Sequence, residues 1–248
     1  MRAIPLLSLA GAVLLTAACG GTSRSNGVAG AKKALGHHCA SGMGQTDSAV
    51  AAIVVRPTTA DRAPAGAPIA RVGLKNVNGV TTVFGVVGAR TDRACRATWL
   101  HVQLPMRPNG ATGWIRAADV QTARVRTRIV VDLSERRVRL YRGGRLVLSS
   151  SAAIGSPATP TPVGRYYVNQ RLVPTDPTGP FGPGAVGISA FSPVLTGWAQ
   201  GGPIAIHGTN QPWSIGHAVS NGCIRLPNAV LRRLFAAAFA GTPVLIRE

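Results

Sequence analysis

Two residues in the last fifth of the chain form a pair that can carry out nucleophilic chemistry. Cys223 follows His207 by 223 − 207 = 16 positions. A cysteine has a pKa of ~8.5 and reacts as the thiolate, so attack near neutral pH requires an adjacent base. The imidazole of His207 titrates near neutrality, so it can take the thiol proton and return it to a leaving amine. The pair predicts cysteine acyl transfer with Cys223 as nucleophile and His207 as base. His217 is a rival base, and core packing of the cysteine is the alternative without chemistry.

The ring of His207 needs an acceptor that holds it in one orientation. No Asp or Glu lies between Asp176 and Arg247, so a backbone carbonyl near Gly208 or a side-chain oxygen is expected to take this role. Gly208 also lets the chain turn away tightly after the histidine.

The residues around the cysteine suit a peptide substrate. Gly222 lets backbone N–H groups approach a substrate closely, so the amides of Gly222 and Cys223 are expected to form an oxyanion hole. Arg225 lies two residues after the cysteine, on the same face of an extended run, and its guanidinium can bind a carboxylate with two hydrogen bonds. The pattern favours a peptide with a free carboxyl group.

The order of these residues resembles a known signature. The run H-G-T-N at 207–210, followed by S-N-G-C-I-R-L at 220–226, resembles the signature of the YkuD family of L,D-transpeptidases, in which an H-G pair precedes [S/T]-H-G-C-[I/V]-R. The run T-P-T-P-V-G at 159–164 and a terminal helix are also similar to this family. The resemblance covers about residues 126–248.

One position departs from the family signature. Where the family usually has His before the G-C pair, this chain has Asn221, which cannot act as an acid or base near pH 7. The family's base corresponds to His207, so activity is still expected. Asn221, Arg225, Ser220 and Thr209 are the residues expected to contact the substrate.

The resemblance implies a reaction on peptidoglycan stem peptides that needs neither metal nor cofactor. Cys223 would attack the bond between the third residue and the terminal D-Ala of a tetrapeptide stem, and an amine of a neighbouring stem would resolve the thioester into a 3→3 cross-link. Water as acceptor would make the protein an L,D-carboxypeptidase, and a protein lysine would make it a wall-anchoring transpeptidase. A non-catalytic lipoprotein that binds wall peptides is the alternative of another class.

Strands and one helix must position these residues. The run I-A-I-H at 204–207 predicts a strand that brings His207 to a sheet edge. Apolar spacing predicts a helix from about Pro227 to Ala240, capped by Asn228 and ended by Gly241. Residues 157–189 are dense in Pro, Gly and Thr and are predicted to be loops. Further strands are predicted at 129–133, 138–141, 146–148 and 244–246.

The first half of the chain predicts a small β-barrel. Its segment 99–115, with a Trp-containing strand, a P-N-G turn and a G-W-I strand, resembles the end of bacterial SH3-like domains. Such modules bind wall peptides or serve as spacers, and His101 within it is expected to be a packing residue. Short β-type runs occur at 51–55, 69–74, 81–87, 99–104 and 113–115.

The predicted fold is mainly β. An SH3-like small β-barrel precedes a YkuD-like β-sandwich with one C-terminal helix. We expect a signal peptide at 1–18, a flexible tether at 19–45, the SH3-like domain at 46–122 and the catalytic domain at 123–248.

The amino terminus predicts export to the cell envelope. Arg2, an apolar stretch and small residues precede Cys19, and this arrangement resembles a lipoprotein signal with Cys19 as the lipidated residue. The protein is then a membrane-anchored lipoprotein that faces the cell wall. An ordinary signal peptide cleaved nearby is the alternative. Thr16 favours this alternative, because lipoprotein signals usually carry Leu at that position.

The remaining cysteines suit an oxidising compartment. With Cys19 acylated and Cys223 reserved for chemistry, Cys39 and Cys95 are expected to form a disulfide, and two free thiols are the alternative. His37 and His38 beside Cys39 lack further ligands at zinc-like spacing, so a solvated loop is expected there and no metal site.

The charge of the chain is strongly positive. Lys and Arg total 27 against 8 Asp and Glu, which implies an acidic neighbourhood. No basic helix or aromatic RNA motif occurs, so nucleic acid is not expected as a partner. Anionic cell-wall polymers are candidate partners, and the alternative is that the Arg content reflects genomic base composition.

Overall fold

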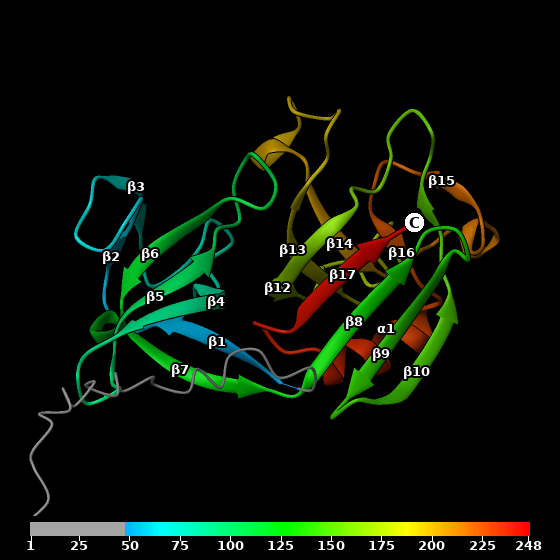
Figure 1. Ribbon diagram of the computed structural model, residues 1–248. Helices are drawn as coiled ribbons and strands as arrows, with labels where there is room; N and C mark the ends of the chain where they lie inside the picture. The colour runs from blue at the N-terminus through cyan, green and yellow to red at the C-terminus, as the bar shows by residue number, and fades with distance from the viewer. Residues whose placement is uncertain (1–47) are drawn as a thin grey trace, which may run out of the picture. The chain divides into compact units, whose positions relative to one another are not determined.

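The computed structural model describes residues 48–248, which form two large β-sheets, a two-stranded ribbon and one α-helix (Figure 1). The mainly β architecture with a single helix is therefore confirmed for the described part of the chain. The expected signal peptide, lipidated Cys19, tether and Cys39 lie outside it.

Residues 49–125 form a seven-stranded antiparallel sheet in the order β3-β2-β6-β5-β4-β1-β7. The predicted hairpin is present, because β5 pairs with β6 and places Trp99 opposite Arg116. Strands β2 and β7 were missed in the sequence pattern because they carry few large apolar residues. The strands are β1 (Ala49–Val54), β2 (Thr58–Asp61), β3 (Pro68–Val72), β4 (Val83–Thr91), β5 (Ala97–Gln103), β6 (Thr112–Arg116) and β7 (Val120–Val125).

The second sheet has eight strands in the order β10-β9-β8-β17-β12-β13-β14-β16. Strand β17 follows every other strand in the sequence, yet it lies in the middle, parallel to β8 and antiparallel to β12. The short strands β11 (Ile154–Gly155) and β15 (Ala218–Ser220) form the separate ribbon. The eight strands are β8 (Thr127–Asp132), β9 (Arg137–Arg142), β10 (Arg145–Ser151), β12 (Gly164–Leu172), β13 (Ala185–Phe191), β14 (Pro203–His207), β16 (Ile224–Arg225) and β17 (Pro243–Arg247).

The prediction that residues 157–189 are loops is wrong over two segments. Strands β12 and β13 lie near the middle of the second sheet, and six of the seven residues of β13 are buried. A strand covered on both faces does not alternate between apolar and polar residues. Its Gly and Ser positions therefore suggested a loop. The segment 173–184 between the two strands does lack regular structure.

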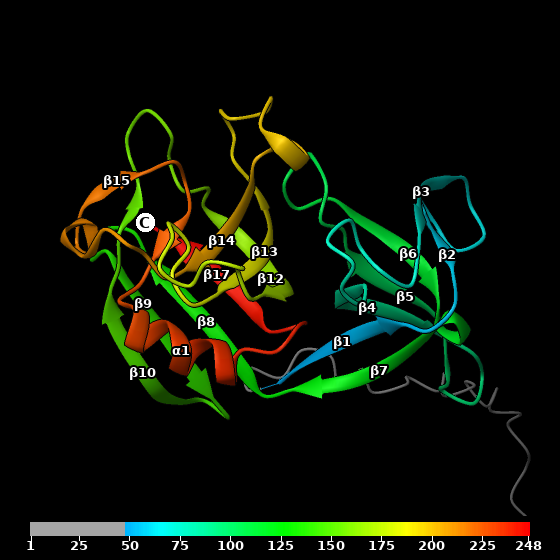
Figure 2. The ribbon, with the colours of Figure 1, turned by 180° about the vertical axis from the view of Figure 1, so that it is seen from behind.

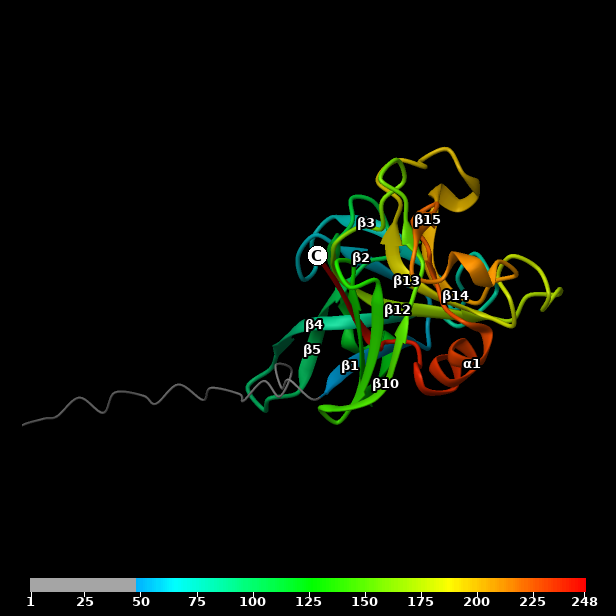
Figure 3. The ribbon, with the colours of Figure 1, turned by 90° about the vertical axis from the view of Figure 1, so that its right-hand side faces the viewer.

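Helix α1 (Asn228–Ala237) is shorter than the predicted helix from Pro227 to Ala240. The backbone leaves the helical region at Ala238, before Gly241. Leu231 and Leu234 are buried in the core of the second sheet, so the apolar spacing was a correct guide to the buried face. Figures 2 and 3 show α1 lying along one face of this sheet.

The predicted capping of this helix by Asn228 is wrong. Pro227 occupies the N-cap position, and no side chain caps the helix. The Asn228 side chain bonds instead to the backbone of Thr209, 19 residues earlier. Capping is a local rule, and this longer-range contact is the one that the side chain makes.

The two sheets share contacts along β4 and β12. Tyr167 of β12 is 2% exposed and packs in the core of the first sheet with Phe84. Gly85 makes room for it, since a Cβ at that position would lie 3.0 Å from the tyrosine ring. The Gln103 amide donates to the Arg165 carbonyl at 2.6 Å, and the Asn76 amide donates to Gln170 at 2.9 Å.

Two further observations bear on the sequence-based expectations. Cys95 is disulfide-bonded, and Cys39, its predicted partner, is outside the described residues. Within residues 48–248, no helix is long and apolar enough to cross a membrane.

Candidate active site

Strands β14 and β16 bring the histidine and the cysteine to one place. They pair in parallel, with Ile206 opposite Ile224 and His207 opposite Arg225. Continuing this register by one residue places Cys223 beside Ala205, and the Ala205 backbone hydrogen-bonds to the cysteine sulfur. Since side chains two residues apart share a face of a strand, His207 and Cys223 project from the same face of neighbouring strands.

The His207 ring is fixed by a backbone carbonyl. Its Nδ1 lies 2.5 Å from the Gly208 carbonyl oxygen. A carbonyl only accepts, so Nδ1–H is the donor and Nε2 keeps the lone pair that a general base needs. The side chain is 4% exposed, and the Phe181 ring packs edge-on against it with centroids 4.9 Å apart. The sequence-based expectation of a carbonyl near Gly208 matches this contact.

The surroundings favour a neutral thiol and a neutral imidazole. Burial lowers the pKa of His207 to about 4, the Gly208 hydrogen bond opposes this shift and the Arg225 charge adds to it. Burial also raises the pKa of Cys223, against the Ala205 hydrogen bond and the Arg225 charge. Both shifts disfavour a resting thiolate–imidazolium pair, so the thiol proton would move to His207 only as the sulfur attacks.

The turn before Cys223 is held by side-chain hydroxyls. Ser220 is buried; its hydroxyl donates to the Cys223 carbonyl at 2.5 Å and accepts from the Gly222 N–H at 3.2 Å. Thr161 donates to the Gly222 carbonyl at 2.8 Å, and Thr159 donates to the Ser220 carbonyl at 2.9 Å. The T-P-T-P segment therefore supports the cysteine turn from a distant part of the sequence.

These contacts change which amide is free to meet an oxyanion. The Gly222 N–H, expected as one of two donors, is already bonded to Ser220. Among residues 48–248, no backbone or side-chain group accepts a hydrogen bond from the Cys223 N–H. Gly222 has φ +103°, a conformation that favours glycine. The glycine is therefore required by the backbone of the turn.

A second chain of contacts runs from the helix to Arg225. Asn228 accepts from the Thr209 N–H at 2.8 Å and donates to the Thr209 carbonyl at 3.1 Å. The Thr209 hydroxyl accepts from the Gln211 N–H at 2.9 Å. Gln211 in turn accepts from the Arg225 guanidinium at 2.7 Å. Thr209 and Ser220, both predicted to touch substrate, are buried and hydrogen-bond to neighbouring groups of the protein. Arg225 is partly exposed and lies at the end of this chain of hydrogen bonds.

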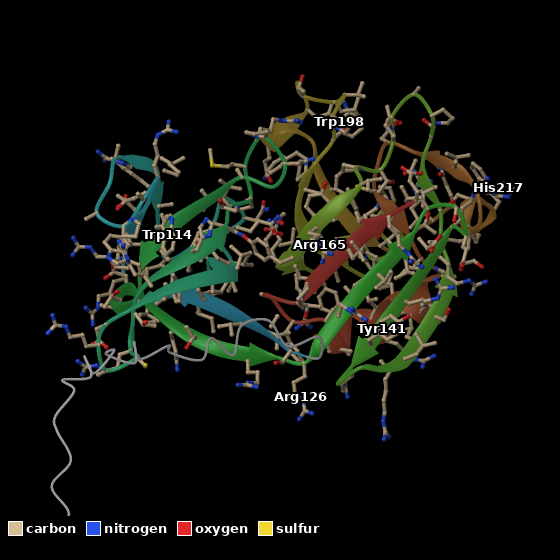
Figure 4. All side chains as sticks on the ribbon, in the orientation of Figure 1. Trp114, Arg126, Tyr141, Arg165, Trp198 and His217 are labelled. Carbon is tan, nitrogen blue, oxygen red and sulfur yellow. The ribbon has the colours of Figure 1, made fainter. Side chains whose placement is uncertain are left out.

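Asn221 and His217 are both exposed. His217 precedes β15, which belongs to the ribbon and not to the sheet that carries Cys223, and Figure 4 places it at the periphery of the molecule. The register therefore favours His207 as the base. Within residues 48–248, no group of three or more His, Cys, Asp or Glu side chains is arranged to hold a metal ion.

Sequence reasoning missed Phe181, Gln211 and the role of Asn228. Phe181 lies in a Pro- and Gly-rich segment without periodicity, so nothing marked it as a neighbour of His207. Gln211 and Asn228 act through partners 14 and 19 residues away. By contrast, the contacts of Thr159 and Thr161 with the cysteine turn do have a signal in the sequence, the T-P-T-P run that resembles the family.

Known proteins match the same part of the chain. Residues 126–246 match the YkuD family model, described as the L,D-transpeptidase catalytic domain. YkuD of Bacillus licheniformis, assigned as an L,D-transpeptidase, is 40% identical over 119 residues, which are 48% of this chain and 64% of that protein. YkuD of Bacillus subtilis, with the same assignment, is 35% identical over 120 residues, which are 48% of this chain and 65% of that protein.

The chain spans less than two thirds of the length of both relatives. Among solved structures, a mutant of the L,D-transpeptidase of Enterococcus faecium is 28% identical, with 49% of each chain covered and a TM-score of 0.39. The family match contains His207 and Cys223, and it contains all residues of the eight-stranded sheet except Arg247, the last residue of β17. Residues 126–246 are therefore similar to the catalytic domain of YkuD-type L,D-transpeptidases.

Proposed function

We propose that this protein is a peptidoglycan L,D-transpeptidase that forms 3→3 cross-links through a thioester on Cys223. The parallel pairing of β14 with β16 carries the proposal, because it sets Cys223 beside the strand that ends in His207. The family match supports the same chemistry. We further propose an exported lipoprotein with an SH3-like domain at 46–122 and a catalytic domain at 123–248.

In the first half of the reaction, the Cys223 sulfur attacks the carbonyl of the third stem residue, and its proton passes to His207 Nε2. We expect the Cys223 N–H to bind the oxyanion that forms. The C–N bond to D-Ala then breaks, His207 returns its proton to the leaving amine, and a thioester remains.

In the second half, an amine of a neighbouring stem attacks the thioester carbonyl. His207 takes the proton that the amine loses, the C–S bond breaks, and the sulfur recovers a proton from His207. A new amide joins the two stems. Arg225 is partly exposed and donates to Gln211, and we expect its guanidinium to bind a stem carboxylate.

Mass spectrometry of the intact full-length protein with a carbapenem tests the nucleophile. We expect one covalent adduct on the wild type and none on Cys223→Ala, with matching circular dichroism spectra for both. Folded wild-type protein without an adduct contradicts the proposal and favours a non-catalytic wall-peptide-binding protein.

Incubation with a disaccharide-tetrapeptide tests the acceptor. Chromatography and mass spectrometry of the products should give dimers joined through their third residues, with release of D-Ala. Tripeptides alone would replace transpeptidation with L,D-carboxypeptidase activity, and attachment of the stem to a protein lysine would indicate wall anchoring.

A further inference from the structure

A cavity of about 1400 Å³ opens between β1, β7, β12 and the segment that follows α1. Neither His207 nor Cys223 lines it, nor does any residue that the site's hydrogen bonds connect to them. Part of the wall is apolar and includes Ile53, Val125 and Phe239. The cavity is therefore separate from the proposed active site.

Arginines surround this cavity, and we call them the arginine rim. Among residues 48–248, no Asp or Glu lines the cavity, and no arginine of the rim belongs to an ion pair. Figure 4 shows one of them, Arg126, where β7 passes into β8. The arginine rim comprises Arg124, Arg126, Arg142, Arg145 and Arg171.

Arg171 is held in place before any ligand arrives. Its guanidinium lies 4.3 Å from the centroid of the Phe235 ring and 5.4 Å from that of Phe239. Stacking on two rings fixes the plane of the donor fork. The buried Nε of Arg171 and the buried Oδ1 of Asn169, a second lining residue, have no hydrogen-bond partner among the described residues.

Five guanidinium groups without counter-charges repel one another, and an anion that enters between them removes this repulsion. The planar fork of arginine matches phosphate oxygens with two parallel hydrogen bonds. A pocket for a small organic ligand is typically about 300–1,000 Å³, so this cavity is larger than a single phosphate requires. The arginines come from β7, the β7–β8 junction, both ends of the β9–β10 turn and β12, so one ligand must present several charges to reach them all.

We propose that the arginine rim binds a ligand that carries two or more phosphate groups, as an oligomeric phosphodiester does. The apolar wall accommodates the carbon backbone between the phosphates. A soluble wall polymer and an anionic lipid headgroup both present this chemistry, and the binding probes below separate the two sources.

Equilibrium binding to the full-length chain tests the proposal, with Cys19→Ser in all samples to exclude a lipid at that position. The probes are a glycerol-phosphate hexamer, phosphatidylglycerol vesicles in phosphatidylcholine, and polyglutamate as a carboxylate polyanion. The rim variant is Arg126→Gln, Arg142→Gln and Arg145→Gln combined. The matched control removes three exposed arginines outside the cavity through Arg56→Gln, Arg62→Gln and Arg93→Gln.

The rim variant should bind the hexamer at least about tenfold more weakly, and the control variant should stay within about twofold of the wild type. Binding to the vesicles alone, with the same pattern among variants, supports the phosphate site and assigns it to lipid. An equal loss in both variants shows attraction to net charge and overturns the proposal. Equal binding of polyglutamate, or no binding to any probe, also overturns it.

Arg171→Lys refines the test. It keeps the charge and removes the stacked fork, so affinity for the hexamer should fall severalfold if the fork makes paired hydrogen bonds. An unchanged affinity removes Arg171 from the site. Carbapenem acylation of Cys223 should be normal in every variant, which reports folding and keeps this result separate from the proposed enzymatic function.

Discussion

Each sheet holds one histidine beside an aromatic ring, but the two histidines differ in their hydrogen-bond acceptor and in the residue on the neighbouring strand. His101 of the first sheet stacks on Trp114, with ring centroids 4.7 Å apart and an interplanar angle of 10°. His207 of the second sheet meets Phe181 edge-on at 4.9 Å. Burial lowers the pKa of both rings.

Of the two, only His207 has a carbonyl that fixes its tautomer and a cysteine directly before the neighbouring strand β16. His101 is paired in its sheet with Gly88 and Trp114, neither of which offers a nucleophile. Aromatic contact and burial are therefore common to a packing histidine and a candidate base. The distinguishing features are the orienting acceptor and the strand register.

The largest expected effect is the loss of acylation rate on replacing His207. His207→Gln should lower the second-order rate of Cys223 acylation by a carbapenem about 10²–10⁴-fold, because the thiol loses its general base. His101→Gln and His217→Gln should change that rate by less than about twofold. The rates can be followed by intact-protein mass spectrometry. A large loss of rate in His217→Gln with little loss in His207→Gln would show that His217, and not His207, is the base.

His207 and His101 should also differ in how much they make the free energy of unfolding depend on pH in acid. The pKa of His207 is about 4 in the folded protein against 6.5 for an unperturbed histidine, so unfolding takes up a proton between these values. The stability from neutral His207 is complete above pH 6.5 and is lost as the pH falls towards 4. The loss should reach about 3 kcal/mol, at ~1.4 kcal/mol per pKa unit.

Urea unfolding of the wild type, His207→Gln and His101→Gln at pH 7.5 and 4.5 measures this difference. His207→Gln should remove most of the pH dependence between the two values, whereas His101→Gln should remove little. A wild-type stability that does not change from pH 7.5 to 4.5 would show that His207 titrates normally.

Loss of the hydrogen bonds between Asn228 and Thr209 should have a smaller effect, on the free energy of unfolding. Asn228→Ala removes two hydrogen bonds to the Thr209 backbone and should lower the free energy of unfolding by about 1–3 kcal/mol. Asn228→Asp keeps the acceptor, so its free energy of unfolding should fall less than that of Asn228→Ala. Asn221→Ala, at an exposed position, is the control and should stay within about 0.5 kcal/mol. Equal stabilities of Asn228→Ala and Asn221→Ala would exclude the bracing role.

Neighbouring tyrosines in β12 provide the smallest and most direct contrast. The Tyr167 hydroxyl is buried in the core of the first sheet and has no hydrogen-bond partner among residues 48–248, so Tyr167→Phe should raise stability by up to about 1 kcal/mol. The Tyr166 hydroxyl donates to the Val163 carbonyl at 3.0 Å, so Tyr166→Phe should lower stability by about 0.5–1.5 kcal/mol. Thermal unfolding of both variants checks the opposite signs.

The sequence was informative where one local pattern determines the outcome. The 16-residue separation of His207 and Cys223, together with the glycines beside them, predicts the pair, and the register of β14 with β16 is consistent with it. The apolar spacing of Leu231 and Leu234 located the helix, and the P-N-G turn located the hairpin. In each case, the residues that form the feature are close together in the chain.

The sequence was uninformative where distant partners decide. Strand β13 is buried on both faces and shows no alternation, so its neighbours in the sheet determine its conformation. Asn228 carries a side chain suited to capping, yet its partner is Thr209. The arginine rim gathers residues from separate segments between 124 and 171. No single stretch of sequence could therefore indicate the cavity.

The central position of β17 determines when the catalytic sheet can form. The chain makes β10, β9 and β8 on one side and β12, β13, β14 and β16 on the other before it makes the strand that joins them. Until residues 243–247 pair with β8 and β12, Cys223 and His207 belong to a half-sheet whose edge is unpaired. A stop codon before residue 243 would therefore leave two half-sheets with exposed edges.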